Sequence, residues 1–319
     1  ASPFTINSAP SSLFCCTEMA EATKKCAVVT GANKGIGFGV VEQLASHGIT
    51  VVLTARNQQR GHEAVEELKR RNLAGEILFH QLDVSDDVSV ASLAEFIKNK
   101  FGKLDILVNN AGISSGKPVE NMDFKKFEES VMKYFVRGEK EGMNWEEFLI
   151  ETPESAEECM NTNYYGTKRM CEAMNPLLLR SESPMIVNVS SSAGLLKNIT
   201  NEWAITVLED AENLTEEKID EVVKKCIENF KEDAPRWAVC VSVYAVSKAA
   251  INAYTRVISK KYPEMCVNAV CPGYVRTDIG FKTGVLSVDE GAESVVRLAL
   301  LPIGSPGGCF FHRKEMTSF

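Results

Sequence analysis

The chain has 319 residues and a net charge of −8, with 45% hydrophobic and 24% charged residues, a composition typical of soluble globular proteins. The acidic balance argues against a nucleic-acid partner, because contacts to phosphates need clustered Lys and Arg, and no apolar run reaches the roughly 18 residues of a membrane-spanning helix. The ten cysteines show neither zinc-ribbon spacing nor a C-x-x-C pair, so we expect no metal site and free thiols in the reducing cytoplasm.

Residues 1–24 precede the first apolar run and are rich in Ser, Pro and Ala. We expect them to form a disordered extension. A transit peptide would be rich in Arg and poor in acids, whereas this segment has no Arg and two Glu.

From residue 25 onward, short apolar runs alternate with amphipathic stretches of helical length. The runs are hydrophobic on both faces, as strands of a covered parallel sheet are. They lie at 26–31, 50–55, 76–84, 104–112, 184–192 and 265–273, with helical stretches at 37–48, 61–72 and 87–102. The alternation predicts a single α/β domain over 25–319, a Rossmann-type doubly wound parallel sheet, with 308–311 as a seventh strand at its edge.

Two polar, helix-prone stretches, about 114–160 and 194–237, interrupt the alternation and read as insertions. The second includes one long amphipathic helix over 213–233, with a start signal of Thr215 followed by two acids. Both follow the carboxyl ends of strands, where open α/β sheets bind ligands, so we expect both to cover a substrate pocket. Candidates for lining that pocket are Val119, Phe127 and Trp203, each of which could equally pack within its own helix.

The run T-G-A-N-K-G-I-G at 30–37 directly follows the first strand and opens a helix. Glycines permit a tight turn and close approach to a phosphate, and the helix N-terminus supplies N–H groups and partial positive charge. The position between strand and helix favours a dinucleotide site over an ordinary turn. The residues expected at the cofactor are Gly31, Asn33, Lys34, Gly35, Ile36 and Gly37.

The second strand ends in Ala55 and Arg56, where an NAD-binding chain would carry an acid for the ribose hydroxyls. Arg56 can form a bidentate pair with a 2′-phosphate, and Lys34 can add a second positive charge. This predicts NADPH/NADP+ as the cofactor. The alternative is that both residues are solvated surface cations.

Polar and small residues also end the third and fourth strands, at the same edge of the sheet. Their carboxylate and amide groups could bind adenine or fix the backbone, although turns end many strands with such residues. The residues concerned are Asp83, Val84, Asn110, Ala111 and Gly112.

Tyr244 and Lys248 open a helical run, and their i, i+4 spacing puts the phenol and the ammonium on one face. A phenol with a pKa of about 10 is a poor base near neutrality. A Lys charge roughly 4 Å away contributes on the order of 4 kcal/mol at an effective dielectric constant of about 20, which could lower that pKa toward neutrality. We therefore expect Tyr244 to transfer a proton with Lys248 as its partner. Alone, the Y-x-x-x-K spacing would arise by chance.

The order of these motifs resembles the short-chain dehydrogenases/reductases, whose TG-x-x-x-G-x-G, NNAG, Ser and Y-x-x-x-K motifs occur here between Thr30 and Lys248. The resemblance implies hydride transfer between a nicotinamide and a carbonyl or alcohol. It also implies that Ser191 orients the carbonyl, that Asn163 holds a proton-relay water and that Lys248 binds the nicotinamide ribose. The segment implied beside the nicotinamide contains Pro272, Gly273, Val275 and Thr277.

The 53 positions between Ser191 and Tyr244 exceed the spacing in most of the family. In this respect the chain resembles the plant reductases related to salutaridine reductase and menthone (neomenthol-forming) reductase. That resemblance implies a monomer, because the insertion covers a helix face used elsewhere for tetramers, and a small apolar cyclic ketone of terpenoid or alkaloid type as substrate. The segment 232–248 is shorter and more apolar than the resemblance predicts.

Two other functions stay open. Isopiperitenone reductase, of the same group, reduces an alkene and carries Glu at the tyrosine position; since this chain keeps Tyr244, ketone reduction is favoured over enone reduction. A non-catalytic NADPH-binding sensor would need the glycine loop without needing Ser191, Tyr244 and Lys248 together.

Overall fold

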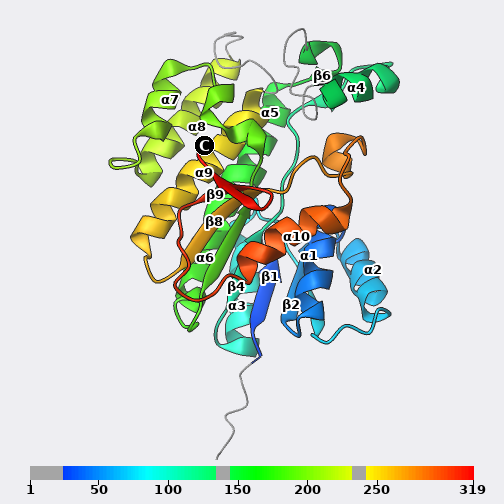
Figure 1. The fold of residues 1–319 in the computed structure, drawn as a ribbon, viewed down its shortest axis with the longest axis vertical. Coiled ribbons are helices and arrows are strands. Elements are labelled where there is room, and N and C mark those ends of the chain that lie inside the picture. The colour runs from blue at the N-terminus through cyan, green and yellow to red at the C-terminus, as the bar shows by residue number, and fades with distance from the viewer. Residues whose placement is uncertain (1–23, 134–143, 232–241) are drawn as a thin grey trace, which may run out of the picture.

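The computed structural model describes residues 24–133, 144–231 and 242–319. The expected N-terminal extension and most of the apolar segment before Tyr244 lie outside these ranges. Eight strands form one sheet in the order β10-β9-β8-β7-β4-β1-β2-β3, with β10 antiparallel to β9 and all other neighbours parallel (Figure 1). The strands are β1 (Cys26–Val29), β2 (Thr50–Ala55), β3 (Ile77–Gln81), β4 (Ile106–Asn109), β7 (Met185–Val189), β8 (Cys266–Cys271), β9 (Phe310–His312) and β10 (Glu315–Thr317). This confirms the predicted doubly wound Rossmann-type sheet.

The prediction of about seven strands, with 308–311 at the edge, is corrected at one end of the sheet. That segment forms β9, but the chain turns back and β10 pairs with it as the outermost strand. All three residues of β10 are exposed. A strand without a buried face has no hydrophobic pattern, which is why the sequence did not show it.

Helices cover both faces of the sheet because its inner strands are apolar on both sides. In β1, Ala27 and Val29 join one core cluster while Cys26 and Val28 join the other. The first cluster lies under one helical layer and the second under a larger layer on the opposite face. The first layer contains α1 (Gly35–Ser46), α2 (Gln58–Lys69) and α10 (Val288–Ala299), and the second α3 (Asp87–Phe101), α6 (Gly166–Leu178) and α9 (Ser242–Lys261).

The first insertion forms a small lobe beyond the carboxyl end of the sheet (Figure 1). Met122, Phe127, Val131 and Phe148 make its own apolar cluster. The lobe contains β5 (Lys117–Pro118), α4 (Phe124–Val131), the 3-10 turn η2 (Trp145–Glu147) and the two-residue strand β6 (Leu149–Ile150). The last part of the predicted insertion, α5 (Pro153–Met160), instead continues through a π-helical segment, η3 (Asn161–Tyr165), into α6 and so belongs to the core helices.

The second insertion forms α7 (Glu202–Glu209) and α8 (Glu216–Lys231), of which α8 is the predicted long helix. Its apolar face, with Ile219, Val222 and Val223 buried, packs on α9 and α5. The helices therefore cover other helices, in contrast to the expectation that this insertion covers the pocket, because the outer faces of α9 and α5 are apolar and accept them. Of the described part of this insertion, residues 194–231, only the turns at 195–198 reach the cavity.

Buried polar contacts fix α8 in this position. Asp220 accepts hydrogen bonds from the Tyr164 hydroxyl and from Lys168 Nζ, both at 2.7 Å. We expect Asp220→Ala to lower the free energy of unfolding by about 1.5 to 3 kcal/mol, because it leaves the fully buried Tyr164 phenol without its acceptor and removes one of the two acids beside Lys168, the other being Glu216. Urea unfolding would measure this loss. Glu221→Ala, at an exposed position on the same helix, is the control and should change stability by less than about 0.5 kcal/mol; equal effects would contradict the assignment.

Within the ranges that the structure describes, no helix combines the length and apolar character needed to cross a membrane.

Candidate active site

The glycine loop between β1 and α1 is held closely against the chain that follows β4. Gly31 and Gly35 have φ of +60° and +58°, which L side chains rarely adopt. A Cβ on Gly31 would lie 3.0 Å from the Ala111 Cα. Asn110 Nδ2 donates to the carbonyl oxygens of Thr30 and Gly31 at 2.8 and 3.1 Å, so the Asn-Asn-Ala-Gly run fixes the shape of the loop.

A cavity of about 1160 Å³ runs along the carboxyl ends of the strands from this loop to Tyr244. It is larger than the roughly 300 to 1,000 Å³ of ordinary small-molecule sites and has room for a dinucleotide with a substrate. Most predicted site residues line it: Gly31, Asn33, Lys34, Gly35, Ile36, Arg56, Val84, Asn110, Ala111, Gly112, Ser191, Tyr244, Lys248, Pro272, Gly273, Val275 and Thr277.

Two predicted cofactor residues, Gly37 and Asp83, do not line this cavity. A Cβ on Gly37 would lie 2.4 Å from Asn110 Nδ2, so this glycine serves the packing of α1 against the strand end. The Asp83 carboxylate accepts hydrogen bonds from Ser85 N and Oγ at 2.9 and 2.6 Å. These bonds give Asp83 a backbone-fixing role, because a carboxylate after a strand readily closes the following turn; its binding of adenine stays a prediction.

Asn163 is fully buried in η3, behind the cavity wall. Its Oδ1 accepts from Ile113 N at 2.9 Å, and its Nδ2 donates to Ile113 O and Ser247 Oγ, both at 3.0 Å. The side chain therefore ties the loop after β4 to α9. Asn163 thus lies in a π-helical segment, and such segments are frequent at functional sites.

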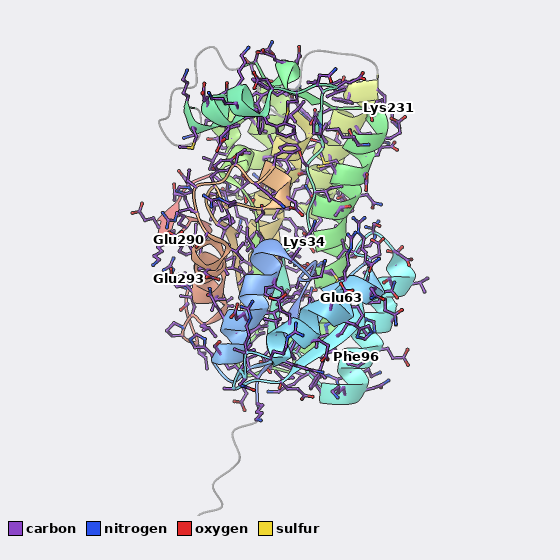
Figure 2. All side chains as sticks on the ribbon, turned by 90° about the vertical axis from the view of Figure 1, so that its right-hand side faces the viewer. Lys34, Glu63, Phe96, Lys231, Glu290 and Glu293 are labelled. Carbon is purple, nitrogen blue, oxygen red and sulfur yellow. The ribbon has the colours of Figure 1, made fainter. Side chains whose placement is uncertain are left out.

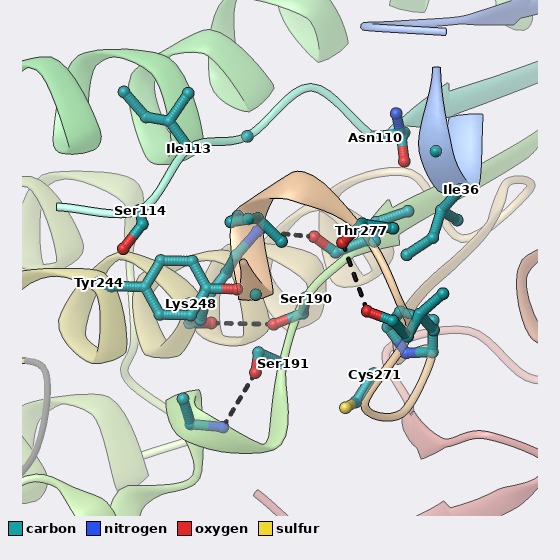
Figure 3. A pocket seen from close by; sticks show the side chains of 18 of the residues that line it. Ile36, Asn110, Ile113, Ser114, Ser190, Ser191, Tyr244, Lys248, Cys271 and Thr277 are labelled. Carbon is teal, nitrogen blue, oxygen red and sulfur yellow. Dashed lines mark hydrogen bonds between the residues drawn. The ribbon is translucent and has the colours of Figure 1, made fainter. Parts of the chain in front are cut away.

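Ser191, Tyr244 and Lys248 meet where β7 ends against the first turns of α9 (Figure 3). The Tyr244 hydroxyl hydrogen-bonds with the Ser191 side chain. Lys248 Nζ donates to Val189 O at 2.9 Å and lies 5.6 Å from the centre of the Tyr244 ring. The fold therefore brings together a hydroxyl, a phenol and an ammonium that lie on two separate elements.

Burial governs the proton affinities of this group. It raises the pKa of Tyr244 above its ordinary value of 10, against the opposing effect of the Ser191 hydrogen bond. Burial therefore has the largest effect on the Tyr244 pKa in the structure, and the lowering of this pKa that the spacing of Tyr244 and Lys248 predicted does not outweigh it. Tyr244 is a protonated phenol near neutrality and can act as a proton donor.

Burial also lowers the pKa of Lys248 from 10.5 to about 8. The charged form is present below that pH and is lost as pH rises through it. We expect kcat/KM for the dinucleotide, which reports the free enzyme, to fall above a pH of about 8. A pH–rate profile would measure this. Lys248→Arg, which keeps its charge, should move the fall to higher pH; an unchanged profile would contradict control by Lys248.

The predicted phosphate-binding cations line the cavity beside the glycine loop, and each has an acidic partner. Lys34, at the amino end of α1 (Figure 2), lies 2.5 Å from Asp278, and Arg56 lies 4.0 Å from Glu158. All four side chains are more than half exposed, so these ion pairs are weak and exchangeable.

A further cation that was not predicted from the sequence, Arg60, lines the cavity together with Asn57. Asn57 Oδ1 caps α2 by accepting from Arg60 N at 2.9 Å. The i, i+4 spacing of Arg56 and Arg60 was the signal that could have found it.

Part of the cavity wall is apolar and aromatic. Phe127 comes from the first insertion, and its ring centre lies 5.5 Å from that of Phe281 in the segment after β8. The other two expected lining residues lie elsewhere: Val119 packs in the cluster of the first insertion, and Trp203 packs against the core with Lys225 Nζ 3.9 Å from its ring centre. Further apolar walls come from Val131, Trp145, Leu149, Leu195, Tyr274 and Ile279.

The sheet, the glycine loop and the Ser-Tyr-Lys group together define an oxidoreductase of the short-chain dehydrogenase/reductase family, and the chain belongs to that family. The family's sequence model, described as short chain dehydrogenase, matches residues 25–138. The predicted family resemblance is confirmed.

Three relatives of 46% identity or more are plant enzymes. The chain is 57% identical to (+)-neomenthol dehydrogenase of Arabidopsis thaliana, over 94% of this chain and all of that protein. It is 50% identical to (−)-isopiperitenone reductase of Mentha piperita, over 93% and 98%. The solved structure of salutaridine reductase from Papaver somniferum superposes with a TM-score of 0.82 at 46% identity, covering 90% of this chain and 99% of that one. These findings also confirm the predicted plant subgroup.

Proposed function

We propose that this protein uses NADPH/NADP+ to reduce the carbonyl of a small apolar cyclic ketone, of terpenoid or alkaloid type, to an alcohol, or to catalyse the reverse reaction. One observation carries the proposal: a protonated Tyr244, hydrogen-bonded to Ser191, lines a cavity that also has aromatic and aliphatic walls. An apolar wall selects an apolar substrate, and the two hydroxyls are the polar groups that orient its carbonyl.

The residues fit a nicotinamide dinucleotide. Gly31 and Gly35 have left-handed backbone and lie at the amino end of α1. Because they lack side chains, phosphates could approach the backbone there. Arg56, Arg60 and Lys34 would hold a 2′-phosphate, and Lys248 with the 272–277 segment would hold the nicotinamide ribose and ring. When bound, NADPH supplies the hydride.

In the proposed mechanism, Tyr244 donates its proton to the substrate oxygen as negative charge develops there. Ser191 hydrogen-bonds the same oxygen and so orients the carbonyl. Lys248 lies beside Tyr244, and its ammonium stabilises the phenolate that remains. Asn163 positions this end of the cavity through its bonds to Ile113 and Ser247, and takes part in the proton relay by which Tyr244 recovers a proton from solvent.

The relatives support this choice among reactions. The names of two of them, neomenthol dehydrogenase and salutaridine reductase, denote alcohol or ketone chemistry on a terpenoid and an alkaloid. A second candidate, reduction of a conjugated alkene, is favoured by the 50% identity to isopiperitenone reductase. Tyr244 supports the ketone reaction, because a phenol at this point delivers a proton to oxygen. A non-catalytic sensor would have no need of the Ser191, Tyr244 and Lys248 arrangement.

We also propose that the protein acts as a monomer in the cytoplasm. The outer faces of α9 and α5 are already covered by α8, which leaves less apolar helix surface for a second copy. The seven cysteines in the described ranges are free thiols, as proteins of reducing compartments have.

The test is NADPH oxidation with a panel of menthone-, isopiperitenone- and salutaridine-like ketones, followed by product analysis. Ketone reduction predicts an alcohol product, with any conjugated C=C bond intact. A saturated ketone product from a conjugated enone would favour the alkene reaction, and no turnover across the panel would contradict the substrate class.

A further inference from the structure

One nucleophilic group in the cavity has no part in the proposed reduction. Cys271 ends β8, directly before the 272–277 segment, and its side chain lines the cavity near Ser191 (Figure 3). The parallel pairing of β8 with β9 puts His312 beside it, since Cys271 and His312 are register partners. His312 lines the same cavity and is exposed, whereas Cys271 is 3% exposed.

The surroundings of the Cys271 sulfur are those of an anion site. The thiol receives hydrogen bonds from the His312 side chain and from the backbone N–H groups of Ser192 and Gly273. Charged groups near the pair are Lys248 from α9, Arg313 beside His312, and Glu315 on β10; Tyr244, a protonated phenol, lies on α9. Three donors therefore face the sulfur and Lys248 is the cation near it, while Arg313 and Glu315 act as opposite charges on the His312 side.

This environment separates Cys271 from the other described cysteines. Burial works to raise the pKa of the Cys271 thiol, but the hydrogen bonds from His312, Gly273 and Ser192 outweigh it and hold the pKa below its usual value. The contact with Cys271 in turn raises the pKa of His312. Burial instead raises the pKa of the remaining described thiols, to about 12 in four of them: Cys26, Cys159, Cys171 and Cys226.

We propose that Cys271 and His312 form a nucleophilic pair that captures α,β-unsaturated carbonyl compounds covalently inside the substrate cavity. The thiolate is the reactive form of a cysteine, and the pair provides it on the wall of the cavity that the proposed substrates enter. The proposal goes beyond ketone reduction, because it needs neither the dinucleotide nor Tyr244.

The reaction is a simple addition. The thiolate sulfur forms a bond to the β-carbon, and the π electrons of the C=C bond move toward the carbonyl to give an enolate. The α-carbon then takes a proton from His312 or from water. Sulfur and hydrogen are added across the double bond, and no atom needs an external oxidant or reductant. The adduct would occupy the cavity beside Ser191 and block the entry of a ketone.

The experiment treats the whole protein, without dinucleotide, with 2-cyclohexen-1-one and maps the adducts by peptide mass spectrometry over time. We expect Cys271 to react about 10-fold faster than Cys309 at neutral pH, although Cys309 is the more exposed of the two, because reactivity follows the thiolate fraction. Cyclohexanone, which lacks the double bond, is the matched probe and should give no adduct.

His312→Gln tests the pairing. It should slow the reaction of Cys271 about 10-fold and move its pH dependence upward, while the rate at Cys309 stays the same. Reaction of Cys309 as fast as Cys271, or a rate at Cys271 unchanged by His312→Gln, would overturn the proposal.

Loss of activity gives a separate readout. Treatment with the enone should remove most of the ketone turnover of the wild-type protein. The Cys271→Ser variant should reduce ketone at the same rate before and after the treatment. Wild-type protein that carries the adduct on Cys271 and still turns over ketone at full rate would overturn the placement of the thiol in the substrate cavity. Ketone reduction itself is measured without the enone, and adduct formation is measured without the dinucleotide. Failure of either proposal therefore leaves the other intact.

Discussion

Tyr244→Phe is expected to lower kcat for ketone reduction by about 10³-fold, within the range that a positioned general acid contributes. The substitution removes the hydroxyl that donates the proton and keeps the ring that fills the space between Ser191 and Lys248. Binding of the dinucleotide should change little. The measurement is kcat and KM for NADPH and for ketone, with thermal unfolding to show that the fold is intact.

The matched control for this change is Tyr262→Phe. Tyr262 directly follows the last residue of α9 and does not line the cavity. The same loss of a hydroxyl there should leave kcat unchanged. Full ketone turnover by the Tyr244 variant would show that another group is the acid.

Arg56→Ala is expected to lower kcat/KM for NADPH by about 10- to 100-fold and to leave kcat/KM for NADH almost unchanged, because hydrogen bonds to a charged group contribute about 1.5 to 3 kcal/mol. The ion pair of Arg56 with Glu158 spans 4.0 Å between exposed side chains, so its loss should not disturb the fold. Adding Arg60→Ala should reduce the preference for NADPH further, since Arg60 lines the same end of the cavity.

The comparison of the two dinucleotides is what makes this result informative. Arg70→Ala removes an arginine from the other end of α2, away from this cavity, and should affect neither cofactor. Equal losses with NADPH and NADH in the Arg56 variant would mean that this residue does not recognise the 2′-phosphate.

The parts of the fold that the sequence predicted are those governed by local pattern. The core strands are apolar on both faces, as β1 shows by contributing alternate residues to two core clusters. α8 begins directly after Thr215, and its first residue, Glu216, is the first of the two acids of the predicted start signal. Strand β10 had no such pattern, because all of its residues are exposed.

The site divides in the same way. The glycine loop and the spacing of Tyr244 and Lys248 are written within eight and five consecutive residues, so the sequence alone located them. Other features depend on elements that are distant in the chain. These are the packing of α8 and the choice of which lysine or arginine reaches the cavity. Asn163 illustrates this, since its partners Ile113 and Ser247 lie 50 and 84 positions away.

By itself, then, the sequence determined the parallel α/β architecture, the family and the candidate site residues, because short periodic patterns and turn motifs act over a few residues. Only the tertiary structure decided the proton affinities. Tyr244 stays protonated, Lys248 has its pKa lowered to about 8 and Cys271 has its pKa lowered beside His312. The physical reason is that desolvation and hydrogen bonding depend on what surrounds a group in space, and here those neighbours come from β7, β8, β9 and α9, which meet only in the folded chain.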